Sequence, residues 1–413
     1  MTKIVIVGAG FGGLNAAKKL YGSEYEVLVL DKTNHHLFQP LLYQVAGAML
    51  SPGDIAAPVR DILRSYKNTT CFLANVLEID KENKRVKTSD GNEYPFDYLI
   101  LAPGARHSYF GHPEWEKFAP GLKSLEDAVR IRERILFAFE EAEKCDNPEK
   151  IKELLRFVII GGGPTGLELA GTIAEISHGA LFKNFRRIQP ELAEIIVIEG
   201  APRLVAHYPT HLSEIAKRDL EKLGVKVRLG IHVTNITEEG VYLGEELIRT
   251  EHVIWAAGNQ ASPLLQKLVV PLDRAGRVEV GPDLSVPGHP DIFVIGDAAA
   301  VKNAKGEPLP AIAPVAIQQG EYVAEVIRKG QEKQQRKSFR YFDKGSLATI
   351  GRSKAVGQIW GLDVSGFLAW MMWSLIHIFY LISFRNRFFV MLDWAAWYLT
   401  GKRQVRLIKK PLK

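Results

Sequence analysis

One pattern of residues occurs twice in this chain, and each copy is typical of a strand, a tight turn and a helix. An apolar run at residues 4–7 leads into a glycine-rich loop at 8–13, and a second run at 157–160 leads into another at 161–166, both spaced G-x-G-x-x-G. The first glycine permits the turn, the second lets the backbone approach a pyrophosphate, and the third lets the helix pack on the strand. The helix N-terminus then presents N–H groups to the phosphates. Two such units predict two parallel sheets, each binding one dinucleotide.

A second strand that ends in an acid follows each loop. The run 26–31 ends at Asp31, and the run 194–199 ends at Glu199. An acid at this place bonds the adenosine ribose, and it repels a 2′-phosphate. The glycine spacing, the preceding strand and the terminal acid occur together in both copies. This argues against the alternative that the two loops are unrelated glycine turns in a parallel sheet. Glu199 is therefore expected to disfavour a dinucleotide with a 2′-phosphate, an effect that Arg203, four residues later, could soften.

Three further strand ends complete the pattern. The apolar run 98–101 precedes Ala102, Pro103 and Gly104, the run 253–255 precedes Ala256, Ala257 and Gly258, and the run 291–295 precedes Gly296 and Asp297. An Asp at the last of these positions can bond a ribitol hydroxyl of a flavin, while the helix start that follows faces its phosphate. Five motifs in this order resemble the two-dinucleotide flavoproteins of the pyridine nucleotide-disulfide reductase type, over about residues 3 to 330.

This resemblance implies an α/β fold with two Rossmann-like domains, one for FAD and one for NADH. The FAD domain is expected at 1–115 and 280–330, the NADH domain at 155–275, and a connecting helix at 124–144. The implied FAD-binding residues are Gly8, Gly10, Phe11, Gly12, Gly13, Asp31, Lys32, Pro40, Val76, Ala102, Pro103, Gly104, Gly296, Asp297, Ala313 and Pro314. The implied NADH-binding residues are Gly161, Gly163, Pro164, Thr165, Gly166, Glu168, Glu199 and Gly258.

The cysteines exclude part of this family. The chain has two, Cys71 in a strand-like run and Cys145 at the end of a charged helix, and they form no closely spaced pair. A redox dithiol beside the flavin is therefore excluded, and with it the disulfide reductases and the sulfide-oxidising relatives that need paired cysteines. Two cysteines without a signal peptide favour a reducing compartment. The electrons are expected to leave for something other than a protein disulfide.

The C-terminal region carries both the apolar and the basic character of the chain. Residues 364–384 contain no charged side chain, and residues 388–399 contain only Asp393. Residues 385–413 hold eight Lys or Arg and one acid, a net charge of +7 in a chain whose total is +6. Four of the seven tryptophans also lie here. Apolar surface, tryptophans and basic flanks are typical of a membrane-surface element, and we expect no nucleic-acid binding.

This region is expected to lie flat rather than to span a bilayer. Residues 364–384 are long enough to cross, but Ser374 and His377 interrupt them, and the second apolar stretch is too short to return. Two helices in one leaflet, joined at residues 385–387, fit better. A buried or dimer-forming helix remains an alternative, because a partner can cover apolar surface. The expected C-terminal domain, 338–413, thus contains strands and then membrane-anchoring helices.

Two segments narrow the resemblance to the type II, non-pumping NADH:quinone dehydrogenases. One is residues 35–44 (HHLFQPLLYQ) and the other residues 313–320 (APVAIQQG). The resemblance implies that NADH passes hydride to N5 of the FAD and that two electrons then reach a membrane quinone. The implied catalytic residues are Glu168, Gln318 and Gln319, and the implied quinone-binding residues are Pro314, Gln318 and His377. Pro314 replaces a glutamine, and Thr172 stands where some relatives carry a glutamate, so the roles of those two side chains do not transfer.

Other expectations concern alternatives and partners. The alternative role of Glu168 is that of an ordinary acid on a helix surface rather than a neighbour of the nicotinamide. A soluble flavin reductase with a protein acceptor, or a non-enzymatic NADH sensor, would use the same two loops. The family resemblance favours a peripheral enzyme on the cytoplasmic face of the cell membrane and, by default, a homodimer. The sequence shows no metal-ligand cluster.

Overall fold

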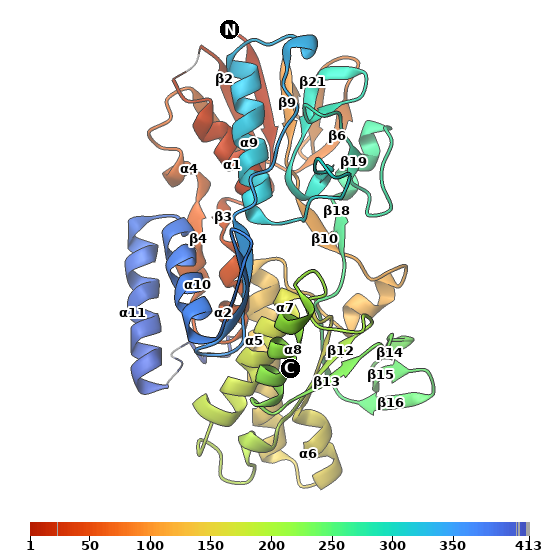
Figure 1. Ribbon diagram of the computed structural model, residues 1–413, viewed down its shortest axis with the longest axis vertical. Helices are drawn as coiled ribbons and strands as arrows, with labels where there is room; N and C mark the ends of the chain where they lie inside the picture. Colours follow the sequence, from red (N-terminus) through yellow and green to blue (C-terminus); the bar gives the residue numbers. More distant parts are fainter. Residues whose placement is uncertain (23, 402, 404, 410–413) are drawn as a thin grey trace. The chain divides into compact units, whose positions relative to one another are not determined.

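The computed structural model describes residues 1–22, 24–401, 403 and 405–409, and Figure 1 shows it coloured along the chain. The chain forms two compact units, which are described separately. The first unit comprises residues 1–37, 56–106 and 259–343, and the second comprises 38–55, 107–258 and 344–413. The remaining residues of the predicted basic tail, 402, 404 and 410–413, lie outside the described residues.

A six-stranded sheet forms the centre of the first unit. Its order is β20 (Ser285–Val286), β21 (His289–Val294), β9 (Tyr98–Leu101), β1 (Lys3–Val7), β2 (Glu26–Asp31) and β5 (Thr69–Leu73), and only β20 is antiparallel to its neighbour. The strands are rich in Val, Ile and Leu because a parallel sheet is covered on both faces. Helices α1 (Phe11–Lys19) and α9 (Ala313–Arg328) pack together so closely that a Cβ on Gly320 would overlap the Gly12 carbonyl.

An antiparallel sheet shares a hydrophobic core with this central sheet. It consists of β6 (Val76–Asp80), β7 (Arg85–Thr88) and β8 (Glu93–Pro95), and its buried residues cluster with those of β1, β9 and β21. The shorter elements of the unit are β3 (His35–Leu37), β4 (Ala56–Pro58), α4 (Val59–Ile62), β18 (Asn259–Ala261), η5 (Pro263–Leu268), β19 (Val278–Glu279), η6 (Gly296–Ala298), β22 (Ala299–Ala300) and η7 (Lys333–Gln335). β10 (Ala105–His107) ends at the boundary of the unit.

The second unit repeats the parallel arrangement with four strands. Their order is β13 (Val225–Leu229), β12 (Glu194–Glu199), β11 (Arg156–Ile160) and β17 (His252–Trp255). The helices of this part are α2 (Leu42–Ala46), α3 (Pro52–Ile55), α5 (Leu125–Lys144), α6 (Pro148–Leu154), α7 (Pro164–Glu175) and α8 (Thr210–Glu221). The predicted connecting helix is confirmed as α5, which begins with a capping box between Ser124 and Asp127.

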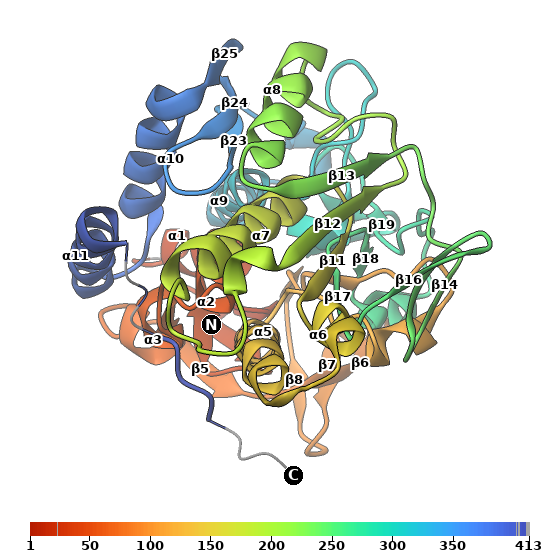
Figure 2. The same ribbon diagram turned by 90° about the horizontal axis from the view of Figure 1, so that it is seen from below.

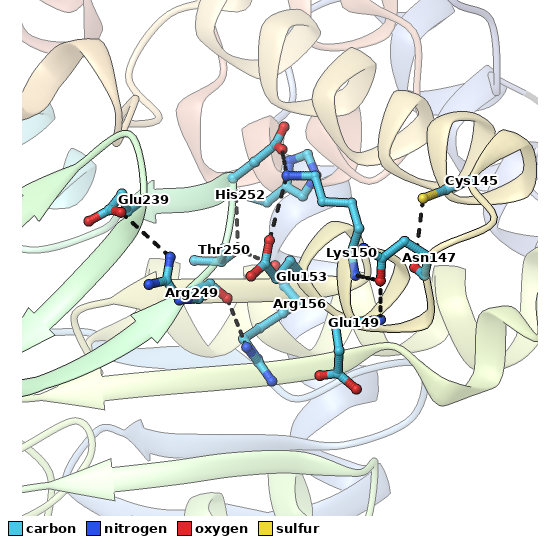
Figure 3. Close-up of polar contacts among 11 residues, drawn as sticks. Cys145, Asn147, Glu149, Lys150, Glu153, Arg156, Glu239, Arg249, Thr250 and His252 are labelled. Carbon is cyan, nitrogen blue, oxygen red and sulfur yellow. Dashed lines mark hydrogen bonds and ion pairs between the residues drawn. The ribbon is translucent and has the colours of Figure 1, made fainter.

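Short elements and polar contacts complete this half. They are η1 (Gln39–Leu41), η2 (Pro113–Lys117), the π-helix η3 (Ile176–Ala180), η4 (Pro190–Leu192) and the antiparallel strands β14 (Asn235–Thr237), β15 (Gly240–Leu243) and β16 (Glu246–Arg249). Figure 3 shows polar side chains around the start of β11: Lys150 of α6 pairs with Glu153 at 3.5 Å, and Arg156 of β11 donates to the Arg249 carbonyl at 2.8 Å. Lys150 also pairs with Glu251 at 2.6 Å. These contacts lie at the surface, and they are structural.

The C-terminal part of the second unit is a small sheet followed by two helices. Strands β23 (Gly345–Thr349), β24 (Ala355–Ile359) and β25 (Leu362–Ser365) are antiparallel, and helices α10 (Gly366–Tyr380) and α11 (Phe384–Thr400) follow them. In Figure 2 this sheet lies beside α8, to which Lys354 is joined by an ion pair with Asp219 at 2.9 Å. Among the described residues, no helix combines the length and apolar character needed to cross a membrane.

Two predicted boundaries differ from the structure. The two C-terminal helices are separated at residues 381–383, where Leu381 is extended and Ser383 has φ +77°, so residues 385–387 belong to the first turn of α11. The compact units also differ from the expected domains, because residues 38–55 group with the second unit and residues 259–279 with the first. Residues 38–55 include α2, which packs on α5 and α7, and this long-range packing has no local sequence signal.

Candidate dinucleotide sites and apolar surface

The first glycine-rich loop has the backbone that its sequence requires. Gly8 has φ +100° and donates its N–H to the Leu30 carbonyl at 2.8 Å. A Cβ at Gly8 would overlap the carbonyl of Ala102, and a Cβ at Gly13 would overlap the carbonyl of Gly8. No other residue type fits at these two positions, because an added carbon would separate α1 and β9 from the loop.

The second loop repeats this geometry in the second unit. Gly161 has φ +113° and donates to the Ile198 carbonyl at 2.8 Å. A Cβ at Gly161 would come within 2.7 Å of the carbonyl of Ala256, and a Cβ at Gly166 would overlap the carbonyl of Gly161. The two loops are therefore matched contact by contact.

The helix that follows each loop begins in a way suited to an anion. Gly10 and Gly163 are the N-caps of α1 and α7, both are extended, and neither helix receives a hydrogen bond from a side chain at its cap. A Cβ on either glycine would meet nothing within 4 Å. A helix start without a side-chain cap, and with open space at the second glycine of the preceding loop, can accept a pyrophosphate.

The two acids that end the second strands also match. Asp31 accepts hydrogen bonds from the backbone N–H groups of Ala9 (2.5 Å) and Thr33 (2.6 Å). Glu199 accepts from those of Gly162 (2.5 Å) and Ala201 (2.7 Å). Each carboxylate is thus held at its loop by two backbone donors.

Arg203 is engaged within its own loop. Its guanidinium donates to the carbonyls of Tyr208 (3.0 Å) and Ala206 (2.7 Å) and to the Thr210 hydroxyl (2.8 Å). These bonds would have to break before Arg203 could bind a 2′-phosphate. The prediction that Glu199 disfavours a 2′-phosphate is therefore not weakened by Arg203 as it lies here.

His36 supports the first loop, a role that the sequence pattern did not show. It is buried, its Nδ1 lies 2.9 Å from the Ala9 carbonyl, and its ring meets that of Phe11 edge to face at 5.0 Å. Since a carbonyl only accepts, Nδ1 carries the proton. Burial lowers the pKa of His36 to about 4, so the ring is neutral near pH 7. Its Nε2 has no hydrogen-bond partner among the described residues and is a buried acceptor.

The other residues predicted for FAD lie mostly in the first unit. Lys32 is exposed after β2, Val76 is buried in the core at the start of β6, and Ala102, Pro103 and Gly104 follow β9. Asp297 is the second residue of η6, after Gly296, whose φ is +69°. Ala313 and Pro314 form the first turn of α9. Pro40 lies in η1 of the second unit.

The residues predicted for NADH all lie in the second unit. Pro164, Thr165 and Glu168 are in the first turns of α7, and Gly258 follows β17 with φ +70°. Burial raises the pKa of Glu168 well above its ordinary value, and a hydrogen bond from the Thr349 backbone opposes this shift. Glu168 is partly buried, and its surroundings shift the carboxyl toward the protonated form.

The two glutamines assigned to the quinone make bonds within the first unit. Gln318 exchanges two hydrogen bonds of 2.9 Å with the backbone of Phe342. Gln319 is buried and accepts from the Gly296 N–H at 2.6 Å. Gln319 thereby fixes the strand end that carries Asp297, and this structural role was not visible in the sequence.

His377 lies in α10 against other aromatic rings. Its Nδ1 is 2.7 Å from the Trp373 carbonyl, and its ring stacks on Trp373 at 4.1 Å. Burial lowers the pKa of His377 to about 4, so at neutral pH it is not an imidazolium that can give up a proton. It keeps one ring nitrogen as an acceptor.

Helices α10 and α11 expose many large apolar side chains. The exposed ones are Phe367, Leu368, Met371, Leu375, Ile376, Phe379, Tyr380, Phe384, Phe388, Phe389, Met391, Leu392 and Leu399, and we call this set the apolar face. Cations lie over aromatic rings beside it: Arg352 over Tyr398 (4.7 Å), Arg385 over Phe389 (4.9 Å) and Arg387 over Phe379 (5.9 Å). An apolar surface of this size marks an interaction site rather than ordinary solvated surface.

A buried ion pair also escaped the sequence analysis. Arg403, whose side chain is fully buried, pairs with Glu175 of α7 at 2.8 Å and donates to the Gly47 carbonyl. It thereby ties the end of the chain to α7. The two thiols take no part in this network, because Cys71 lies in β5 of the first unit and Cys145 caps α5 in the second.

Known proteins match this chain over nearly its full length. The family model of the pyridine nucleotide-disulphide oxidoreductases matches residues 2–320, and that of the NDH2 C-terminal domain matches residues 344–403. The type II NADH:quinone oxidoreductase Ndh of Mycobacterium tuberculosis is 43% identical over 97% of this chain and 89% of its own, and NdhA of the same organism is 42% identical over 97% and 88%.

A solved structure gives the same result for the fold. The structure of NDH2 from Plasmodium falciparum in complex with NADH superposes with a TM-score of 0.88 at 22% identity, covering 98% of this chain and 99% of that one. The chain belongs to the pyridine nucleotide-disulphide oxidoreductase family and, within it, to the type II NADH:quinone oxidoreductases.

Proposed function

We propose that this chain oxidises NADH and reduces a quinone by means of a bound FAD. The observation that carries this conclusion is the pair of matched loops, in which each uncapped helix start is paired with an acid held at the same place. Two dinucleotide sites in one chain without a cysteine pair suit an electron transfer from a nicotinamide through a flavin to an acceptor that is not a disulfide.

The residues of the first loop fit an FAD. The open space at Gly10 would admit the pyrophosphate, Asp31 would bond the ribose, and Asp297 would bond the ribitol chain. His36 offers a buried Nε2 that can accept a bond from a hydroxyl. When bound, FAD supplies the chemistry of accepting a hydride and releasing electrons in pairs or one at a time.

The chain's own residues bind and orient the substrates. The start of α7 would bind the NADH pyrophosphate, and Glu199 would accept from the ribose hydroxyls. Glu168, whose pKa is raised by burial, would lie at the nicotinamide carboxamide and would donate a hydrogen bond to it in its protonated form. We assign the quinone carbonyl to Gln318 or Gln319 of the first unit, where Pro314 lies one turn earlier on the same helix. His377 of the second unit, which is neutral, stays a prediction for quinone binding.

We further propose that the apolar face rests on the bilayer, with the enzyme peripheral on the cytoplasmic side. Aromatic and aliphatic side chains would enter the interface, and Arg352, Arg385 and Arg387 would lie at the level of the phosphates. Such cations contribute about 1 kcal/mol each near an anionic leaflet. This arrangement gives a quinone dissolved in the membrane a short route to the enzyme. The homodimer stays a prediction that light scattering in detergent would test.

The first experiment is an anaerobic titration of the detergent-purified protein. NADH should bleach the flavin absorbance near 450 nm, and a short-chain quinone should restore it within the same mixing experiment. Bleaching without recovery would move the acceptor to a protein, which is the soluble-reductase alternative. Failure of NADH to bleach the flavin would contradict the assignment of the second loop. In proteoliposomes, NADH oxidation should proceed without translocation of protons.

A further inference from the structure

The C-terminal sheet contacts the helix of the NADH loop along one face. The contact is made by Thr349, which ends β23, and by residues 350–352, which follow it; we call residues 349–352 the β23 turn. It reaches α7 at Glu168, Gly171 and Glu175. These positions are separated by three and four residues, so they lie on one side of the helix.

The first contact orients the carboxyl that we place at the nicotinamide. The Thr349 backbone forms a hydrogen bond with Glu168. Thr349 is itself buried, and its hydroxyl lies 2.9 Å from that of Tyr43 in α2, which also accepts from Gln44 at 3.0 Å. Thr349, which contacts Glu168 through its backbone, is thus fixed through its side chain by the bond to Tyr43.

The second and third contacts hold the helix itself. A Cβ on Gly171 would lie 2.7 Å from the backbone nitrogen of Gly351, so helix and turn touch through their main chains. Gly351 has φ +63°, a conformation that favours glycine. One turn of helix later, Glu175 accepts from the Arg352 backbone and pairs with Arg403.

These contacts connect the C-terminal sheet, which precedes the helices of the apolar face, to the second glycine-rich loop. The N-terminus of α7 is the phosphate end of the second loop, and the same helix carries Glu168. We propose that the β23 turn is part of the NADH site, with Thr349 as the residue that positions Glu168 and Gly171 as the contact that sets the distance between α7 and the turn. This inference rests on the proposed function, because it needs NADH at the second loop.

The test compares two glycine-to-alanine variants of the full-length holoenzyme. Gly171→Ala inserts a methyl group against the turn, whereas Gly179→Ala is a matched control in which the Cβ meets nothing within 4 Å. We expect Gly171→Ala to lower the rate of flavin bleaching by NADH by about ten- to a hundredfold, because misplacement by about 1 Å has effects of this size. Calorimetry should show weaker binding of NAD⁺. Gly179→Ala should behave as wild type in both measurements.

The rate of flavin reoxidation by quinone shows whether Gly171→Ala affects only the NADH site or the folding of the whole enzyme. Enzyme reduced with dithionite should be reoxidised by quinone at the same rate in wild type and in Gly171→Ala, per bound flavin. Equal losses in both half-reactions, or no loss in either, would overturn the proposal. If the wild type itself is not bleached by NADH, the proposed function fails instead, and the two failures are distinguished.

Thr349 provides an independent test should Gly171→Ala not fold. Thr349→Val keeps the shape and the backbone N–H but loses the bond to Tyr43, whereas Thr349→Ser restores the hydroxyl. We expect Thr349→Val to slow flavin reduction by NADH several-fold without slowing reoxidation, and Thr349→Ser to recover most of the rate. A Thr349→Val enzyme with the wild-type rate of reduction would refute the assignment of Thr349.

Discussion

Removing Arg403 should destabilise the second unit strongly, because it leaves a carboxylate buried without its partner. The Arg403 side chain is fully buried, that of Glu175 is 16% exposed, and the two lie 2.8 Å apart. Breaking a buried pair by deleting one partner costs about 3–5 kcal/mol in the free energy of unfolding. For a unit of this size about 1 kcal/mol corresponds to a shift in Tm of roughly 2–4 °C, so Arg403→Ala should lower Tm by roughly 6 °C or more.

The sign of the pH dependence follows from Glu175. Burial raises the pKa of its carboxyl, and the charge of Arg403 opposes that shift, so in Arg403→Ala the pKa of Glu175 rises further. A group whose pKa is raised in the folded state contributes stability that is present at low pH and lost as the pH rises through the folded pKa. The deficit of Arg403→Ala relative to wild type should therefore be larger at pH 8 than at pH 5.

Differential scanning calorimetry of the holoenzyme across this pH range measures both effects. Arg403→Ala combined with Glu175→Gln should recover part of the lost Tm and lose the pH dependence of the deficit, since no charge is left buried. Arg385→Ala is the matched control, because Arg385 is an exposed cation over Phe389 and should shift the unfolding free energy by less than about 1 kcal/mol. An Arg403→Ala enzyme within about 1 kcal/mol of wild type at pH 8 would refute the reasoning.

Three further predictions use the matched features of the chain. Gly13→Ala should prevent flavin binding, whereas Gly166→Ala should give a yellow protein that NADH does not bleach, because each Cβ overlaps its own loop; absorbance spectra before and after NADH check both. Glu199→Ser should raise kcat/KM for NADPH relative to NADH by about tenfold or more, since it removes the repulsion of the 2′-phosphate; an unchanged ratio in steady-state assays would contradict this. Leu375→Glu should abolish sedimentation with vesicles, while Leu192→Glu, at an exposed leucine outside the apolar face, should not.

The parts of the fold that depend on local sequence could be predicted. The positions of β1, β2, β11 and β12 and of the helices after both loops follow from glycine spacing and apolar runs, and they are confirmed. The helix predicted at 124–144 is likewise confirmed as α5. In each case the decisive interactions lie within a few residues or within one βαβ unit.

Long-range packing was not predictable in the same way. The break between α10 and α11 falls at Ser383, a residue with positive φ that no glycine or proline marks, while the basic residues 385–387 lie inside a helix. The partners of Gln319, Glu175 and Thr349 are far away in the chain, and their types are compatible with many surroundings. A sequence pattern finds such residues only as candidates.

The two loops are so alike that their geometry cannot decide which nucleotide each one holds. Both have the same glycine conformations, the same helix start and an acid bonded to two backbone donors. The difference lies in what surrounds them. In the first unit Gln319 fixes the strand end that carries Asp297, which suits a ribitol chain. In the second unit the β23 turn contacts Glu168 on the helix itself, a carboxyl whose pKa is raised by burial, and this suits a nicotinamide. The specificity of each site is therefore a property of segments added around the βαβ unit, and variants of Asp297 and Thr349 should affect the two sites separately.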